Sequence, residues 1–291
     1  MHLLPIIEQL LDGLVAAALY LLVALGLSLI FRLGGIVNLG HGPFYAIAAY
    51  LAVELSGALG FAGSMALAAA LVGVLGIGIE RMLFRGFHGA DPARALIVTF
   101  ALVMVAQESL RATFGSAPIA VETPPDPGGE IRLLGMRYST YRWMILAVAA
   151  LAVGSISLLI HRTPFGRVVR AGMQDPEVVG ALGISLTPYM TALAALGAVL
   201  AALAGVLSAP IASVHPAMGS EILVAAACIA VIGGLGSIRG LVAAALLVGV
   251  VRGLASHLVA PAGDAAMYLL TAAVLLLRPS GLVRERIDNL R

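Results

Sequence analysis

The sequence predicts an all-α polytopic membrane protein that forms a single membrane domain over residues 1–291. Of its residues, 61% are hydrophobic and only 11% are charged, and the mean hydropathy is +1.05. Soluble domains average about 25% charged residues, so this chain cannot cover a water-facing surface with polar groups. Its apolar runs are continuous and do not alternate with polar residues, which favours transmembrane helices over a β-barrel.

Nine segments approach the length of about 20 apolar residues that a helix needs to cross the hydrocarbon core. The second, seventh and ninth are short or interrupted, so we expect eight to nine transmembrane helices, some of them broken. The predicted spans cover residues 11–31, 36–55, 60–80, 94–111, 142–161, 189–212, 222–237, 241–259 and 265–278. Glu8 and Asp12 stand where a signal peptide carries basic residues, so the first segment is expected to be kept as a span.

The arginines predict that the N-terminus lies outside and the C-terminus in the cytoplasm. With this orientation the arginines of the tail and of most loops fall on the cytoplasmic side, where basic residues are favoured. Those that fall outside, against the rule, are Arg111, Arg132, Arg137 and Arg142. The net charge of +2 is too small to indicate a nucleic-acid partner.

Two polar loops have different character. Residues 112–141 contain TPPDPGGE and are expected to form an external excursion that is not helical. Residues 161–188 are expected inside and contain Asp175-Pro176-Glu177, which is typical of a helix start, with an N-cap, a first-position proline and an acid in the first turn. Gly183 lies where such a helix would end. This short helix either docks a partner or serves as a solvated connector.

The segment GGIVNLGHGPFYAIAAY, residues 34–50, interrupts an otherwise apolar chain. Its glycines and Pro43 weaken helix continuity, and Asn38 and His41 would share one face of any helix that persists. Broken helices at membrane depth occur where protein or a water-filled cavity satisfies the freed backbone, and transporters use them to line the substrate path. The alternative is that the two polar side chains bond a neighbouring helix.

A second break lies within residues 205–240, where an apolar span is followed by His215, Pro216 and Glu221, a short apolar run and a cluster of glycines. The first half of the chain has the same order of span, break with a histidine and short run. Because the two leading spans are predicted to run in opposite directions, this order indicates an inverted internal repeat. The interrupted segments of such repeats point to a translocation path.

Other polar residues in apolar runs have ordinary interpretations. Glu108 is expected to pair with Arg111 three residues on. Arg252 either snorkels or pairs with a buried acid such as Glu221. The remaining residues considered, which are expected to serve packing, are Tyr20, Ser28 and Cys228. The histidines are too scattered for a metal site, and the sequence carries no phosphate-binding, dinucleotide or hydrolase motif, so no catalytic residue, metal or cofactor is expected.

Four stretches together resemble the permease subunits of branched-chain amino-acid ABC importers, over nearly the whole chain. They are ALGLSLIFRLGGIVNLGHGPFYAIAAY (24–50), TPFGRVVRAGMQDPEVVGALGI (163–184), VIGGLGSIRG (231–240) and RPSGL (278–282). The first motif of that family has an Asn, then His-Gly, then an aromatic, here Asn38, His41-Gly42 and Phe44. Its coupling loop reads Glu-Ala-Ala, three residues, Gly, and Glu177 and Gly183 match this spacing with valines in place of both alanines.

The resemblance implies an ATP-driven importer subunit in a bacterial or archaeal plasma (inner) membrane. Its implied partners are two cytosolic ABC ATPases, a second permease that is a homologue, a periplasmic or extracellular binding protein and the lipid bilayer. ATP hydrolysis would reside in the partners, so this chain would not be an enzyme. The residues implied on or beside the coupling helix are Arg167, Arg170, Asp175, Glu177 and Gly183.

The predicted substrate path comprises residues of both breaks: Asn38, Gly40, His41, Gly42, Phe44 and His215. A path lined by small apolar residues with isolated polar groups suits a small, net-neutral solute. Branched-chain or other hydrophobic amino acids are favoured, with urea, short amides or small aromatic acids as alternatives. The alternative functions from other classes are an ion-coupled secondary transporter and a membrane-embedded hydrolase.

Overall fold

The computed structural model describes residues 3–34, 38–87, 92–122, 130–133, 136–234, 236–259, 262–279 and 281–283. In these residues, six helices are long and apolar enough to cross a membrane and two apolar helices are shorter. The long helices are α1 (Leu3–Gly34), α2 (His41–Met82), α3 (Pro92–Phe114), α4 (Thr140–Arg162), α7 (Thr187–Ser208) and α9 (Ile238–Leu258). The shorter ones are α8 (Met218–Gly233) and α10 (Ala262–Leu277).

Each of the nine predicted spans falls on one of these helices, which confirms the fold class. The second and third predicted spans both lie on α2, because that helix continues through a kink at Gly60. Gly60 has φ 65°, a left-handed conformation that favours glycine. The expected number of transmembrane helices, eight to nine, therefore depends on whether this one bent helix is counted once or twice.

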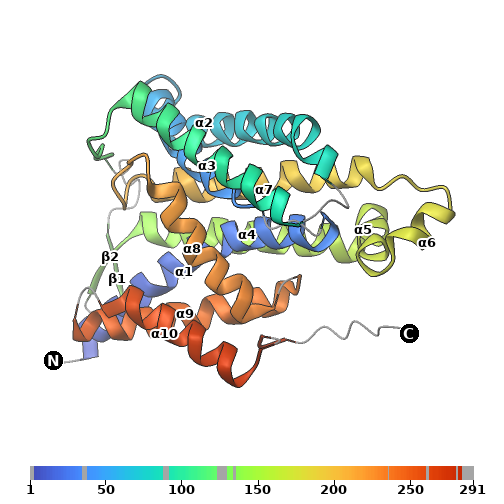
Figure 1. Cartoon of the computed structure of the whole chain (residues 1–291). Helices are drawn as coiled ribbons and strands as arrows, with labels where there is room; N and C mark the ends of the chain where they lie inside the picture. The colour runs from blue at the N-terminus through green and yellow to red at the C-terminus, as the bar shows by residue number, and fades with distance from the viewer. Residues whose placement is uncertain are drawn as a thin grey trace.

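The remaining elements lie at opposite ends of the bundle (Figure 1). The antiparallel hairpin of β1 (Glu130–Leu133) and β2 (Met136–Ser139) lies at the end where α1 begins, whereas α5 (Pro164–Gln174) and α6 (Pro176–Ala181) lie at the other. A single 3-10 turn, η1 (Phe84–Phe87), follows α2. The two polar loops thus fall at opposite ends of the bundle, and the side of the membrane that each faces stays a prediction. The expected non-helical excursion contains the hairpin, which the sequence does not reveal. Within TPPDPGGE (123–130), residues 123–129 lie outside the described residues.

Glycines set how closely the helices pack. A Cβ at Gly13 of α1 would lie 2.2 Å from the carbonyl oxygen of Gly249 on α9, so only glycine allows the two backbones to approach this closely. The same is true where α7 meets α2, since a Cβ at Gly205 would lie 2.1 Å from the carbonyl oxygen of Tyr45. Small residues at helix interfaces are the usual route to close packing inside a membrane, where lipid is as apolar as leucine.

The two halves of the chain pack on each other reciprocally. The leading helices α1 and α7 run in opposite directions (Figure 1), and each packs against the helix that follows the break in the other half, α8 and α2. Gly42 and Gly219, each the second residue of its helix, meet where the breaks face each other. A Cβ at Gly42 would lie 2.2 Å from the oxygen of Gly219, and one at Gly219 would lie 2.6 Å from the oxygen of Gly42. This arrangement agrees with the predicted inverted repeat.

Candidate functional site

A cavity of about 750 Å³ opens between α1, α8, α9 and α10, beside the loop that joins α7 to α8. It reaches toward the end of the bundle that carries the β1–β2 hairpin. Its apolar walls include Val15, Leu19, Met218, Ile222, Ala225 and Met267. Its polar lining includes Asp12, Tyr20, Tyr45, Arg142, Ser208, His215, Glu221, Arg252, Asp264 and Tyr268. The aspartate, glutamate, arginine and histidine side chains of this lining form three pairs.

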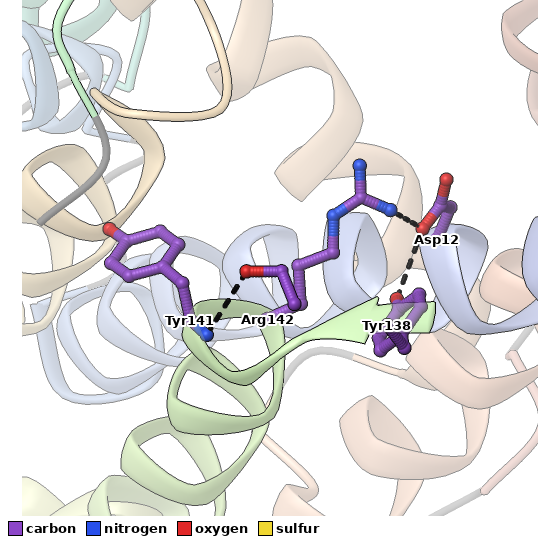
Figure 2. A network of polar contacts seen from close by, with 5 residues as sticks. Asp12, Tyr138, Tyr141 and Arg142 are labelled. Atoms are coloured by element: carbon purple, nitrogen blue, oxygen red, sulfur yellow. Dashed lines mark hydrogen bonds and ion pairs between the residues drawn. The ribbon is translucent and has the colours of Figure 1, made fainter. Parts of the chain in front are cut away.

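The first pair joins α1 to α4 near the hairpin. The Asp12 carboxylate accepts hydrogen bonds from the Arg142 guanidinium and, at 3.0 Å, from the hydroxyl of Tyr138 on β2 (Figure 2). The guanidinium also lies over the Tyr138 ring, 5.3 Å from its centroid. Burial, with a smaller contribution from the Glu8 carboxylate, raises the pKa of Tyr138 to about 12, so its hydroxyl stays protonated and can donate to Asp12.

The second pair joins α9 to α10. Arg252 Nε donates to Asp264 Oδ1 at 3.0 Å, and the guanidinium lies 5.8 Å from the centroid of the Tyr20 ring on α1. Gly263 brings the two helices together, because a Cβ there would lie 2.3 Å from the Ser256 hydroxyl and 3.2 Å from Arg252 Cγ. Asp264, and not Glu221, is therefore the partner of Arg252, and Tyr20 faces the cavity in addition to packing.

The third pair belongs to the second break. His215, in the loop before α8, places Nε2 3.6 Å from Oε2 of Glu221 in the first turn of α8. The His215 side chain is 25% exposed. Its loop is held by paired hydrogen bonds between the backbones of Ile119 and Val214, each 2.9 Å. The structure therefore fixes His215 on the cavity wall with an acidic partner.

Tyr45 of the first break lines the cavity, but the predicted path residues of this break do not. His41 is 0% exposed, and Asn38 and Phe44 are also buried. The His41 imidazole occupies the space left where α1 crosses α7 at Gly26 and Gly197, whose positions would bring a Cβ within 2.5 and 3.0 Å of the ring. The Gly197 backbone faces the ring, but neither ring nitrogen makes a hydrogen bond with a described residue.

Of the predicted path residues, then, the structure places one on the cavity and buries the others. His215 lines it, whereas the buried ones are Asn38, Gly40, His41, Gly42 and Phe44. A role for these five in solute passage stays a prediction. The sequence contains one signal for the burial of His41, namely Gly26 and Gly197, one in each leading span. They leave room for the imidazole ring only when the two helices cross at both glycines.

The predicted helix start at the opposite end is confirmed. Asp175 is the N-cap of α6, and its Oδ1 accepts from the backbone nitrogens of Glu177 and Val178, each at 3.0 Å. Gly183, with φ 77°, follows the end of the helix. Val178 and Leu182 are exposed although apolar, and so is Glu177. This end of the bundle thus presents a short, well-capped helix with apolar and acidic side chains directed outward.

The two predicted arginines of this region are placed differently. Arg170 donates to the backbone carbonyl of Ile160 near the end of α4, so it ties α5 to that helix. Arg167 is exposed on α5. Thr163 caps α5 by accepting from the Gly166 nitrogen at 3.2 Å.

The cavity lining includes residues that sequence reasoning missed as functional candidates, among them Asp12, Tyr45, Arg142 and Asp264. An acidic residue beside or within an apolar helix is by default a functional candidate, and this signal was present at Asp12 and Asp264. Among the described residues, no group of three or more histidine, cysteine, aspartate or glutamate side chains could hold a metal ion.

Comparisons with known proteins cover nearly the whole chain. Residues 9–278 match the family described as "Branched-chain amino acid transport system / permease component". The chain is 29% identical to the high-affinity branched-chain amino acid transport system permease protein BraD of Pseudomonas aeruginosa, with 95% of each chain covered. It is 27% identical to LivH of Escherichia coli, which carries the same description, again over 95% of each chain. A solved structure, "PsaBC from Streptococcus pneumoniae in complex with Fab", aligns at 15% identity and a TM-score of 0.49 over 96% of this chain and 92% of that one.

Proposed function

Because the chain belongs to the family of permease components of branched-chain amino acid transport systems, we propose that it is the membrane subunit through which an ATP-driven importer takes up branched-chain amino acids. Members of this family are transport components and not enzymes, and they work in a lipid bilayer with ATPase and substrate-binding partners. The relatives BraD and LivH are both described as branched-chain amino acid permeases, which supports the substrate class.

The observation that carries this proposal is the placement of two features at opposite ends of the bundle. The cavity with its charged pairs reaches toward the hairpin end, and the capped helix α6 lies at the other. An importer needs this separation, since solute is received on one side of the membrane and ATP is hydrolysed on the other. In our proposal the hairpin end faces the binding protein outside and α5–α6 face the cytosol, with the N-terminus outside and the C-terminus inside.

Coupling is proposed to pass through α6. Glu177, Val178 and Leu182 are exposed on this helix or directly after it, and a cytosolic ATPase that docks there would cover both the acid and the apolar side chains. Movement of the ATPases during ATP binding would shift α6 and, through the Arg170 contact with Ile160, the inner end of α4. A second permease, which we propose to be a homologue of this chain, would complete the membrane part of the importer.

The test is uptake of labelled leucine, isoleucine and valine by proteoliposomes that contain this chain with its ATPases and second permease. We expect uptake that requires both ATP and the binding protein. Uptake driven by an ion gradient without ATP would overturn the importer, and ATP-dependent uptake of urea or amides in place of these amino acids would overturn the substrate.

The coupling role has its own variant. Glu177→Ala should lower substrate-stimulated ATP hydrolysis about tenfold, because a charged contact across an interface is lost, while membrane insertion stays intact. Glu108→Ala is the matched control, since Glu108 is an exposed acid that pairs with Arg111 on α3, far from α6. Equal turnover in Glu177→Ala and wild type would contradict the assignment.

A further inference from the structure

We infer that Arg252 and Asp264 form a headgroup site for a zwitterionic α-amino acid, in which Arg252 binds the carboxylate and Asp264 the ammonium. This inference rests on the proposed function and names the part of the cavity that would recognise the solute. The sequence predicts a path with isolated polar groups only. This inference adds a binding site in which two charged side chains act together.

The pair has polar atoms left over in complementary positions. The bond between the two side chains uses Arg252 Nε and Asp264 Oδ1, 3.0 Å apart. The described interactions leave the two Nη nitrogens of Arg252 and Oδ2 of Asp264 for another partner. Arginine presents its donors in a planar fork that matches a carboxylate with two parallel bonds. A donor fork beside a free carboxylate oxygen matches a headgroup whose carboxylate and ammonium share one carbon.

The surroundings hold this pair in place. The ring of Tyr20 lies under the guanidinium at 5.8 Å, a cation–π contact that orients the fork. Gly263 lets the start of α10 approach α9, so that Asp264 reaches Arg252. The Arg252 side chain is 27% exposed, and both charged residues line the cavity. The Asp264 side chain is 62% exposed. A solute in the cavity can therefore reach both charged side chains, which together with the Tyr20 ring come from three different helices.

An apolar wall adjoins the pair. Met267 follows Asp264 by three residues, so both lie on one face of α10, and Met267 is 1% exposed. Ile222 and Ala225 of α8 line the same cavity and are also buried. With its headgroup on the Arg252–Asp264 pair, an amino acid would place its side chain against these groups, where burial of a branched hydrocarbon is favourable. Urea and short amides carry neither the two charges nor this side chain.

The experiment uses the complete permease–ATPase complex in lipid nanodiscs, without the binding protein. Saturation-transfer NMR is recorded with L-leucine, with 3-methylbutylamine, which lacks the carboxylate, and with 4-methylpentanoate, which lacks the ammonium. All three share one hydrocarbon group. For the wild-type complex we expect a leucine signal about tenfold above that of either analogue, because each analogue loses one charged interaction.

Two variants separate the two charges. Asp264→Asn should remove the advantage of leucine over 4-methylpentanoate, and Arg252→Gln should remove its advantage over 3-methylbutylamine. Arg252→Lys, which keeps the charge without the fork, should give an intermediate leucine signal. Arg111→Gln is the matched control, because Arg111 also forms an ion pair but does not line the cavity, and it should behave as wild type.

The outcomes decide between recognition and a purely structural tether. Loss of a tether between α9 and α10 would weaken all three ligands together, and that result would overturn the site. Equal or absent signals from the three ligands with wild type, or an unchanged leucine signal in both variants, would also overturn it. ATP-dependent leucine uptake is measured in parallel with the binding protein: uptake that persists while the site fails leaves the proposed function standing, whereas wild type that imports no leucine removes the proposed substrate.

Discussion

The two breaks of this chain share a sequence pattern and differ in what their histidines do. Each interrupts the chain between two apolar helices and places one histidine near the start of the helix that follows. His41 is fully buried between α1 and α7, where it faces Gly26 and Gly197. His215 lies on the cavity wall beside Glu221. A break does not by itself determine whether its histidine packs between helices or lines the cavity. The residues opposite the histidine determine this.

The largest effect is expected where the two breaks touch. Gly42→Ala would push a Cβ to 2.2 Å from the Gly219 carbonyl oxygen, and because both partners are backbone, neither can move aside. We expect a loss of about 3 kcal/mol or more of stability, measured as a fall in the melting temperature of the detergent-solubilised complex. Gly57→Ala, also on α2 but with nothing within 4 Å, should be neutral or slightly stabilising. Equal melting of the two variants would contradict the close contact.

A smaller loss is expected at the buried histidine. His41→Ala would leave an empty space at the crossing of α1 and α7 and should cost about 2 to 3 kcal/mol. His41→Leu fills most of that space and should recover much of the stability, since the ring nitrogens make no hydrogen bond with described residues. Melting temperature and leucine uptake are measured together. A well-folded His41→Leu variant that no longer transports would return His41 to the substrate path, as the sequence predicts.

The smallest effect on stability is expected at the second break. His215→Gln should change stability by less than about 0.5 kcal/mol, because the side chain is partly exposed. It should raise the KM for uptake about two- to fivefold, since it removes the imidazole that faces Glu221 on the cavity wall. Ser220→Ala, in the same lining, is the control. A large loss of stability in His215→Gln with unchanged KM would mean that the histidines of both breaks serve packing.

Much of the fold was predictable because it depends on local properties. Hydrophobic run length located every apolar helix, and the Asp175-Pro176-Glu177 signal located α6, since an N-cap depends only on residues two or three positions away. The kink of α2 was not predicted as a bend within one helix. In the sequence, Gly60 marks the start of a separate predicted span. Only the path of the backbone shows that the two predicted spans form one bent helix.

The candidate site was less predictable, because its contacts join distant parts of the chain. Arg252 stood out in an apolar span, but its partner Asp264 is set by the close approach of α9 and α10 at Gly263. Asp12 and Arg142 meet only because α1 packs beside α4. Burial of His41 likewise needs two glycines from helices far apart in sequence. Residue types suggest such groups, whereas helix crossings decide which of them meet.

The Arg252–Asp264 pair has an electrical consequence. The two side chains cancel each other's charge, and so do the two charges of an amino-acid headgroup, so the loaded and empty sites carry the same net charge. Moving one elementary charge through 100 mV of membrane potential costs or releases about 2.3 kcal/mol. A solute that is bound as a zwitterion carries no net charge, so the membrane potential neither adds to nor subtracts from the free energy of its passage. Uptake should therefore proceed at the same rate whether the membrane is polarised or not, and ATP alone sets its direction.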